Sequence, residues 1–74
     1  MAPLRPLPYR EVKRKLEAEG FTQVGQKGSD VKFARQSGEV TRTAIVPRHR
    51  EVAVGRLRSI VRQAGLDPKE FERL

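Results

Sequence analysis

Apolar residues recur at helical spacing in two parts of the chain, one near its beginning and one near its end. In the first part they are Tyr9, Val12 and Leu16. They predict a helix over about residues 9–19, which Gly20 ends as a left-handed cap. In the second part they are Leu57, Ile60, Val61 and Ala64. They predict a second helix closed by Gly65, followed by a short third helix over residues 68–73.

Between these helices the period changes to that of β-strands. Residues 22–24 start a short strand, which Gly25 and Gly28 are expected to interrupt. Residues 30–35 then alternate, so that Val31 and Phe33 face a core while Asp30 and Lys32 face the other way. The β-branched residues 40–46 predict a third strand that Pro47 ends, because proline cannot donate to a sheet ladder.

The order of these elements indicates an α+β fold with a three-stranded antiparallel sheet. Each of the two longer helices has one apolar stripe, so we expect both helices to cover the same sheet face, with the short helix at the C-terminal end. We expect a single domain over residues 1–74, in which the proline-rich residues 1–8 form an extended lead-in. A core of this size is marginal, which favours completion by a homo-oligomer or by a partner protein.

Composition excludes several classes of site and compartment. The chain has no cysteine and one histidine, so it offers neither a disulfide nor a thiolate or histidine-rich metal site, and we expect no metal or cofactor. No apolar run has the length of a membrane span or of a signal-peptide core, which favours a cytoplasmic protein without membrane contact.

The charge balance favours a nucleic-acid partner. The net charge is +7, and residues 21–50 contribute +4 of it, from six basic and two acidic residues. Alternation places Asp30 and Lys32 on the open face of the sheet, with Lys27 in the turn before them and Arg42 joining them if the strands pair as a simple hairpin. From the residues alone, an ordinary solvated surface with weak ion pairs explains the same charges.

The single histidine, His49, follows Val46-Pro47-Arg48 in the loop after the third strand. One interpretation is that its side chain contacts a phosphate or a substrate. The other is that it anchors the loop by a hydrogen bond and so positions the segment before Gly55. Both remain open at the level of the sequence.

Several short motifs resemble those of one family of small bacterial proteins. They are Glu19-Gly20-Phe21, Gly28-Ser29-Asp30-Val31-Lys32-Phe33, Ile45-Val46-Pro47-Arg48-His49 and Gly55-Arg56-Leu57-Arg58-Ser59-Ile60. With them, the chain from Tyr9 to Leu74 resembles the HicA (YcfA-like) toxins, which are mRNA interferases of toxin–antitoxin pairs. The resemblance implies the fold of a double-stranded-RNA-binding domain, with two helices on one sheet face. In that family a histidine follows Gly-Ser and is thought to cleave RNA, whereas this chain has Asp30.

The resemblance also implies a function and a set of site residues. The function is that of a metal-independent endoribonuclease acting on mRNA in the stress response, held in check by a HicB-like antitoxin. Asp30 would occupy the catalytic position. RNA would be bound by Lys27, Ser29, Lys32, Arg42, Arg48 and His49. A carboxylate is a weaker base than imidazole and repels phosphate, so activity should be impaired. The alternative is a non-catalytic RNA-binding module with the same fold.

Overall fold

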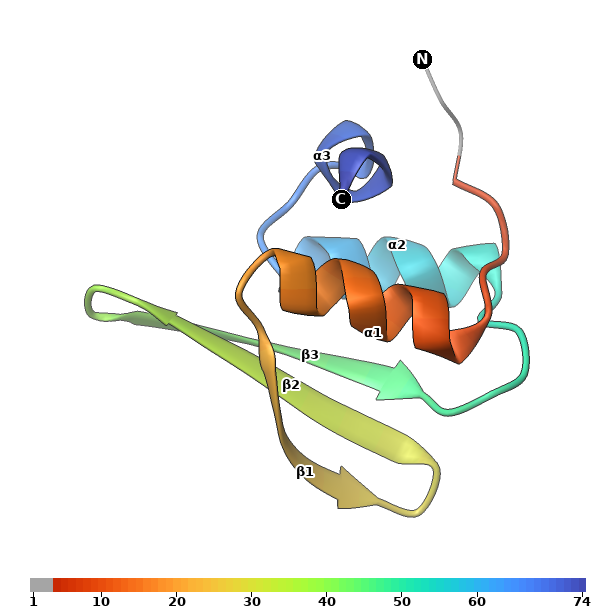
Figure 1. The fold of residues 1–74 in the computed structure, drawn as a ribbon, viewed down its shortest axis with the longest axis horizontal. Coiled ribbons are helices and arrows are strands. Elements are labelled where there is room, and N and C mark those ends of the chain that lie inside the picture. The colour runs from red at the N-terminus through yellow and green to blue at the C-terminus, as the bar shows by residue number, and fades with distance from the viewer. Residues whose placement is uncertain (1–3) are drawn as a thin grey trace.

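The computed structural model describes residues 4–74, so the first three residues of the predicted lead-in lie outside the described residues (Figure 1). Its elements are α1 (Tyr9–Ala18), β1 (Thr22–Lys27), β2 (Asp30–Ser37), β3 (Val40–Pro47), α2 (Val54–Gln63) and α3 (Pro68–Arg73). The three strands form one antiparallel sheet in the order β1-β2-β3. The predicted α+β fold is therefore confirmed.

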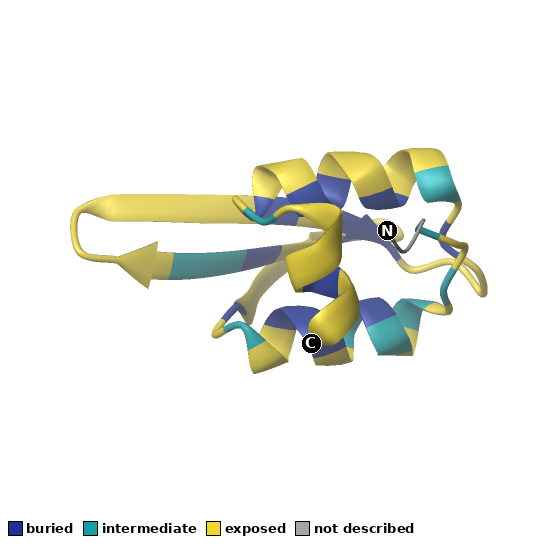
Figure 2. Ribbon diagram, turned by 90° about the horizontal axis from the view of Figure 1, so that it is seen from above, coloured by how far each residue is buried: buried dark blue, intermediate teal, exposed yellow. Residues whose placement is uncertain are grey.

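Helices α1 and α2 lie side by side over one face of the sheet, and the opposite face carries no helix (Figures 1 and 2). Alternation along the strands produces this layering. Val31 and Phe33 of β2 and Ala44 and Val46 of β3 are fully buried toward the helices. The short helix α3 adds the buried ring of Phe71 to the same core. The layering leaves one sheet face open for contacts with another molecule.

Both longer helices end in the way that their glycines predict. Gly20 and Gly65 have φ angles of 101° and 75°, in the left-handed region. The next residue folds back in each case, with the Phe21 N–H donating to the Leu16 oxygen at 2.9 Å and the Leu66 N–H to the Val61 oxygen at 3.0 Å. These Schellman ends turn the chain sharply toward the sheet after α1 and toward α3 after α2.

Strand β1 differs in one respect from its prediction. It continues through Gly25 as far as Lys27, and the expected interruption is a β-bulge, where the register with β2 shifts between Gln23 and Gly25. Gly28 lies in the tight turn that joins β1 to β2, with a φ of 59°. The bulge keeps β1 paired with β2 up to this turn, and so fixes the position of the turn relative to the sheet.

Two arginines on the helix-covered face lie beneath the ends of the two helices. Arg35 of β2 and Arg42 of β3 are directly opposite each other in the sheet. A Cβ added to Gly20 would lie 3.3 Å from Cδ of Arg35, and one added to Gly65 would lie 2.5 Å from Nε of Arg42. Each arginine therefore packs against the glycine that ends one helix, and this pair supports both helix ends.

The extended segment before α1 is attached to the loop before α2. Leu7 and Val52 form a β-bridge in which the Leu7 N–H donates to the Val52 oxygen at 3.2 Å and the Val52 N–H to the Leu7 oxygen at 2.6 Å. The half-buried side chains of Leu4 and Leu7 pack against the core. None of the helices over residues 4–74 has the length and hydropathy required to cross a membrane.

Candidate functional site

The Asp30 position lies at one end of the sheet, where three segments meet. Lys27 and Asp30 are directly opposite each other across the turn between β1 and β2, and Asp30 is also opposite Pro47 at the end of β3. The Arg48 N–H donates to the Ser29 oxygen at 2.6 Å and joins the turn to the loop after β3. We call this region, formed by residues 27–32 with Pro47 and Arg48, the Asp30 end.

Lys32 projects from the open face of the sheet close to Asp30. Its cross-strand neighbours are Gly25 of β1 and Ile45 of β3. Gly25 offers no side chain, and Ile45 is 37% exposed, so Lys32 stands between bare backbone and one apolar side chain. Such a surface presents an ammonium group that another molecule can reach without displacing a neighbour.

Charged groups at the Asp30 end are not paired with one another. Within residues 4–74, the ion pairs closer than 4.0 Å are Glu11–Arg14 and Glu19–Arg35. Asp30, Lys27 and Lys32 are all exposed, and none of their side chains forms a hydrogen bond in this part of the chain. The site therefore combines an exposed carboxylate with unpaired ammonium groups. The ammonium groups can attract a phosphate, but the site contains no buried acid–base pair.

The predicted placement of Arg42 in this group is wrong. Arg42 is opposite Arg35 and shares the helix-covered face with Ala44 and Val46, whereas Lys32 is opposite Ile45 on the open face. Arg42 lies five positions before Pro47 along β3, about 17 Å at the rise of an extended chain. Its guanidinium lies against Gly65, so Arg42 belongs to the support of α2 and not to the Asp30 end.

His49 is exposed and borders a pocket between the loop after β3 and the first turn of α1. The pocket measures about 490 Å³ and is lined by Pro8, Tyr9, Arg10, His49 and Arg50. The His49 side chain forms no hydrogen bond with residues 4–74. Backbone groups of Arg48 and Val52 anchor the loop in its place. The loop is therefore anchored by these backbone groups and not by a hydrogen bond of the His49 side chain to residues 4–74.

Four lining residues of this pocket, Pro8, Tyr9, Arg10 and Arg50, were not identified as site residues from the sequence. Tyr9 and Arg10 begin α1, and Arg50 follows His49, so only the proximity of Arg50 to His49 gave a local signal. The guanidinium of Arg48 lies 5.8 Å from the centre of the Tyr9 ring. Burial raises the pKa of the Tyr9 phenol, partly offset by the nearby Arg48 charge, so the phenol keeps its proton under physiological conditions.

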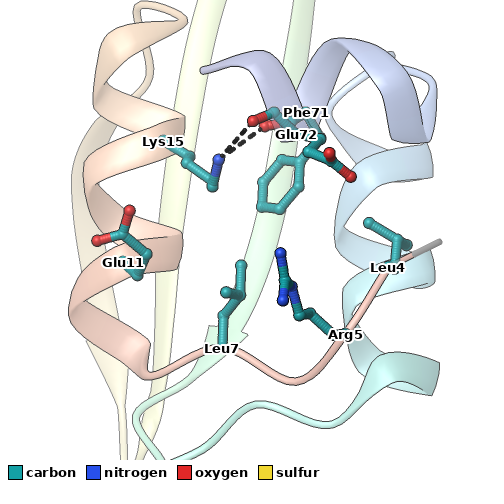
Figure 3. Close-up of a pocket in the computed structure, with 7 residues that line it drawn as sticks. All are labelled: Leu4, Arg5, Leu7, Glu11, Lys15, Phe71 and Glu72. Atoms are coloured by element: carbon teal, nitrogen blue, oxygen red, sulfur yellow. Dashed lines mark hydrogen bonds between the residues drawn. The ribbon is translucent and has the colours of Figure 1, made fainter. Parts of the chain in front are cut away.

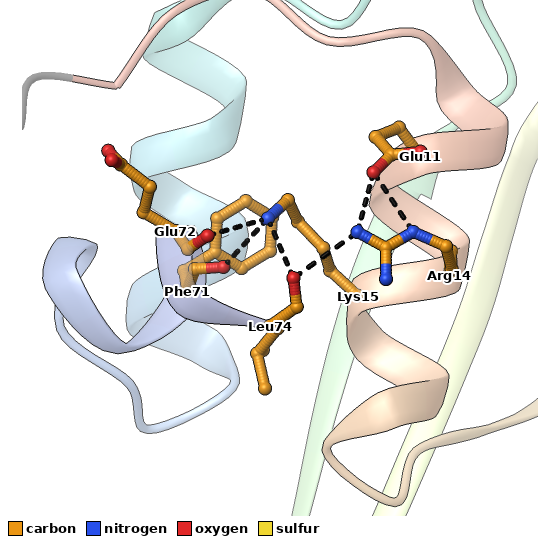
Figure 4. Close-up of polar contacts among 6 residues, drawn as sticks. All are labelled: Glu11, Arg14, Lys15, Phe71, Glu72 and Leu74. Carbon is orange, nitrogen blue, oxygen red and sulfur yellow. Dashed lines mark hydrogen bonds and ion pairs between the residues drawn. The ribbon is translucent and has the colours of Figure 1, made fainter.

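A second cavity, of about 420 Å³, lies between α1, α3 and the segment before α1. It is lined in part by Lys15 and Phe71 (Figure 3). Its buried ammonium group is already occupied. The Lys15 Nζ donates to the main-chain oxygens of Phe71, Glu72 and Leu74 at 3.2, 3.0 and 3.2 Å (Figure 4). Since an ammonium group has three donors, Lys15 holds the end of α3 and has none left for a ligand.

Comparison with known proteins identifies the family of this chain. A family described as the HicA toxin of bacterial toxin–antitoxin pairs matches residues 9–66. No curated protein matches the chain. The matched region begins at the first residue of α1, includes the whole sheet and the Asp30 end, and reaches Leu66 after α2. With a match over most of its length, the chain belongs to the HicA family of bacterial toxins.

Proposed function

We propose that this protein is the RNA-binding toxin subunit of a toxin–antitoxin pair and that the Asp30 end binds single-stranded mRNA. The observation that carries the proposal is the coincidence of the family match with a group of exposed, unpaired cations at one end of the sheet. The cations are Lys27 and Lys32, which have no ion-pair partner within residues 4–74, and Arg48, whose guanidinium also lies 5.8 Å from the centre of the Tyr9 ring. Ser29 and His49 join them. Lysines bind phosphates as point charges, and each contact releases a counterion from the RNA.

By resemblance to its family, the activity proposed for this protein is metal-independent RNA cleavage. This reaction requires a base and an acid. The base removes the proton of a 2′-hydroxyl of the RNA, and the 2′-oxygen then attacks the adjacent phosphorus. The bond to the 5′-oxygen breaks, and an acid protonates that leaving oxygen, while cations stabilise the charged intermediate. Imidazole suits the role of base near neutral pH. An exposed carboxylate is a weaker base and adds a negative charge where the phosphate must approach, so Asp30 impairs cleavage.

Cleavage of one long RNA by the wild type, Asp30→His and Asp30→Asn tests this proposal. EDTA is present throughout, to suppress contaminating metal-dependent nucleases. We expect Asp30→His to cleave, and Asp30→Asn to bind RNA more tightly than the wild type without cleaving. Asp30→Asn is the matched control because it removes the charge without supplying a base. Strong cleavage by the wild type would contradict the assignment of Asp30 as an impairing residue.

The alternative function is a non-catalytic RNA-binding module. The specific observation in its favour is Asp30 itself, an exposed carboxylate without a hydrogen-bond partner in residues 4–74. In that case all three forms bind RNA and none cleaves it. The two functions therefore differ in the cleavage outcome for Asp30→His and not in RNA affinity.

A HicB-like antitoxin, acidic on its contact surface, would cover the open sheet face in the cytoplasm and release the toxin under stress. The support is the sheet face that carries no helix (Figure 1) and the exposed Lys32 on that face, since opposite charges speed and orient association. Because shielding does not use the base, the wild type and Asp30→His should both bind the antitoxin encoded beside the toxin. Calorimetry at two salt concentrations measures this. Failure of the wild type alone would identify a histidine at position 30 as the anchor for the antitoxin.

A further inference from the structure

The pocket beside His49 is built from segments that are far apart in the sequence and are held together by several contacts. Pro8, Tyr9 and Arg10 begin α1, and His49 and Arg50 belong to the loop after β3. The bridge between Leu7 and Val52 fixes these two segments on one side. The Arg48 guanidinium over the Tyr9 ring, at 5.8 Å, fixes them on the other. The two segments that form the pocket are thus held together by backbone and side-chain contacts.

The pocket is continuous with the Asp30 end. Asp30 is opposite Pro47, the Arg48 N–H is bonded to the Ser29 oxygen at 2.6 Å, and His49 follows directly. In Figure 1 the turn between β1 and β2 and the loop after β3 lie at the same end of the sheet. A strand of RNA with one phosphate at Lys32 could therefore run past Arg48 toward His49 and the pocket.

The residues that line the pocket suit a ligand with an anionic group and an attached organic group, such as a nucleotide. None of the five lining residues is acidic, and the guanidinium groups of Arg10 and Arg50 form no hydrogen bond or ion pair within residues 4–74. The volume of about 490 Å³ is within the usual range for small-molecule sites, about 300–1,000 Å³. Pro8 and the Tyr9 ring supply the apolar wall that a ribose or a base can pack against.

We infer that this pocket is a second nucleotide subsite, in which Arg10 and Arg50 bind an RNA phosphate and the Pro8–Tyr9 wall contacts the attached nucleoside. The inference rests on the proposed RNA-binding function and extends it by assigning Tyr9, Arg10 and Arg50 to the RNA path. It makes the bound RNA longer than the open sheet face alone would hold. It also places a contact with the flanking nucleotide outside the position of cleavage.

The test compares two RNA probes, a uridine dinucleotide and a single-stranded RNA octamer, with four proteins. The proteins are the wild type, the double variant Arg10→Gln/Arg50→Gln, the open-face variant Lys32→Gln, and the control Arg73→Gln on α3. Affinity is measured by fluorescence anisotropy over a range of salt concentrations. Circular dichroism and thermal melting verify that each variant is folded. A neutral glutamine keeps the side chain polar, so a folding defect is not expected at these exposed positions.

For the octamer, the double variant should lose affinity on the order of tenfold at low salt, with a salt slope smaller by about 0.7, since Arg10 and Arg50 bind one phosphate and each single-strand phosphate contact contributes about 0.7. For the dinucleotide, the double variant should lose clearly less than Lys32→Gln does. A nuclear magnetic resonance titration of the wild type with the octamer should shift the amide signals of Tyr9, Arg10 and Arg50.

Each other outcome overturns the inference in a recognisable way. If the double variant loses no more than Arg73→Gln while Lys32→Gln still weakens binding, the pocket is not a subsite, and the proposed function stands. If Lys32→Gln and Arg73→Gln cost the same as the double variant, binding is diffuse attraction. If the double variant keeps RNA affinity but loses the antitoxin, the pocket belongs to the protein interface. If the wild type binds neither RNA, the proposed function fails together with the inference.

Discussion

Two groups of cations in this protein differ in what they contact. One group, which we call the covered side, consists of Lys15 between α1 and α3 and of Arg35 and Arg42 on the helix-covered sheet face, and the other group lies at the Asp30 end. On the covered side, Lys15 donates to three main-chain oxygens, Arg35 pairs with Glu19 at 3.1 Å, and Arg42 packs against Gly65. At the Asp30 end, Lys27 and Lys32 have no such partner within residues 4–74. The first group is occupied by the fold itself, whereas the second is available to a ligand.

This difference shows why net charge alone is a poor guide to a binding surface. The central third of the chain carries a net charge of +4, but Arg35 and Arg42 contribute to it from the face that supports the helices. The Arg35 guanidinium also lies 5.4 Å from the centre of the Phe21 ring, which further commits it to packing. Cations can be counted from sequence, but only the contacts separate those that stabilise the fold from those that bind.

The largest effect is expected from Lys15, whose substitution breaks the most contacts on the covered side. Lys15→Met keeps the length of the stem and removes the ammonium. The Glu72 oxygen then has no donor within residues 4–74, while the Phe71 oxygen keeps the Leu74 N–H and the Leu74 oxygen keeps Arg14. Hydrogen bonds to charged groups contribute about 1.5–3 kcal/mol, so we expect a loss of about 2 kcal/mol in the free energy of unfolding. Urea denaturation measures it. The exposed Lys69→Met on α3 is the control, and an equal midpoint for both would contradict the account.

A somewhat smaller effect is expected at the contact between Arg42 and the end of α2. Gly65→Ala places a methyl group 2.5 Å from the Arg42 Nε, at a φ of 75°. The left-handed conformation alone costs about 1–2 kcal/mol for an L-residue, and the flexible Arg42 side chain can move aside, so its displacement adds only a small further cost. In the Arg42→Ala background only the backbone cost should remain, so a double-mutant cycle should show a favourable coupling. Additive losses would mean that Arg42 does not pack there.

The smallest effect is expected from the exposed pair on α1. The side-chain hydrogen bond from Arg14, and then the charge of Arg14, hold the pKa of the Glu11 carboxyl below its usual value. A carboxyl with a lowered pKa in the folded state stabilises the protein above its unfolded pKa, and loses that effect as the pH falls through its folded pKa. The wild type should therefore melt slightly higher than Glu11→Gln at neutral pH, with the gap closing in acid. A gap that is independent of pH would assign the difference to packing.

The sequence predicted the elements better than it predicted the site. Helix ends could be predicted because Gly20 and Gly65 each impose a local conformation. The face occupied by Arg42 could not, because β3 has apolar residues of both parities. Ala44 and Val46 are buried in the structure, while Ile45 on the opposite face is 37% exposed. Only the register with β2 decides between them.

The pocket beside His49 could not be predicted from the sequence, for a different reason. Its two sides come from residues 8–10 and 49–50, and they are brought together by the bridge between Leu7 and Val52. No local pattern marks a contact between segments so far apart in the chain. The position of Asp30, by contrast, could be predicted, because a turn glycine and strict alternation along β2 fix both its place and its exposure.

The comparison between the two groups of cations is tested most directly by one RNA-binding experiment on a matched pair, Lys32→Gln and Arg42→Gln. Affinity for a single-stranded RNA octamer is measured over a range of salt concentrations, and Arg73→Gln on α3 serves as the reference. The account predicts that Lys32→Gln weakens binding and lowers the salt slope by about 0.7. Arg42→Gln should match Arg73→Gln in RNA affinity and differ only in stability. Equal losses for Lys32→Gln and Arg42→Gln would contradict the account.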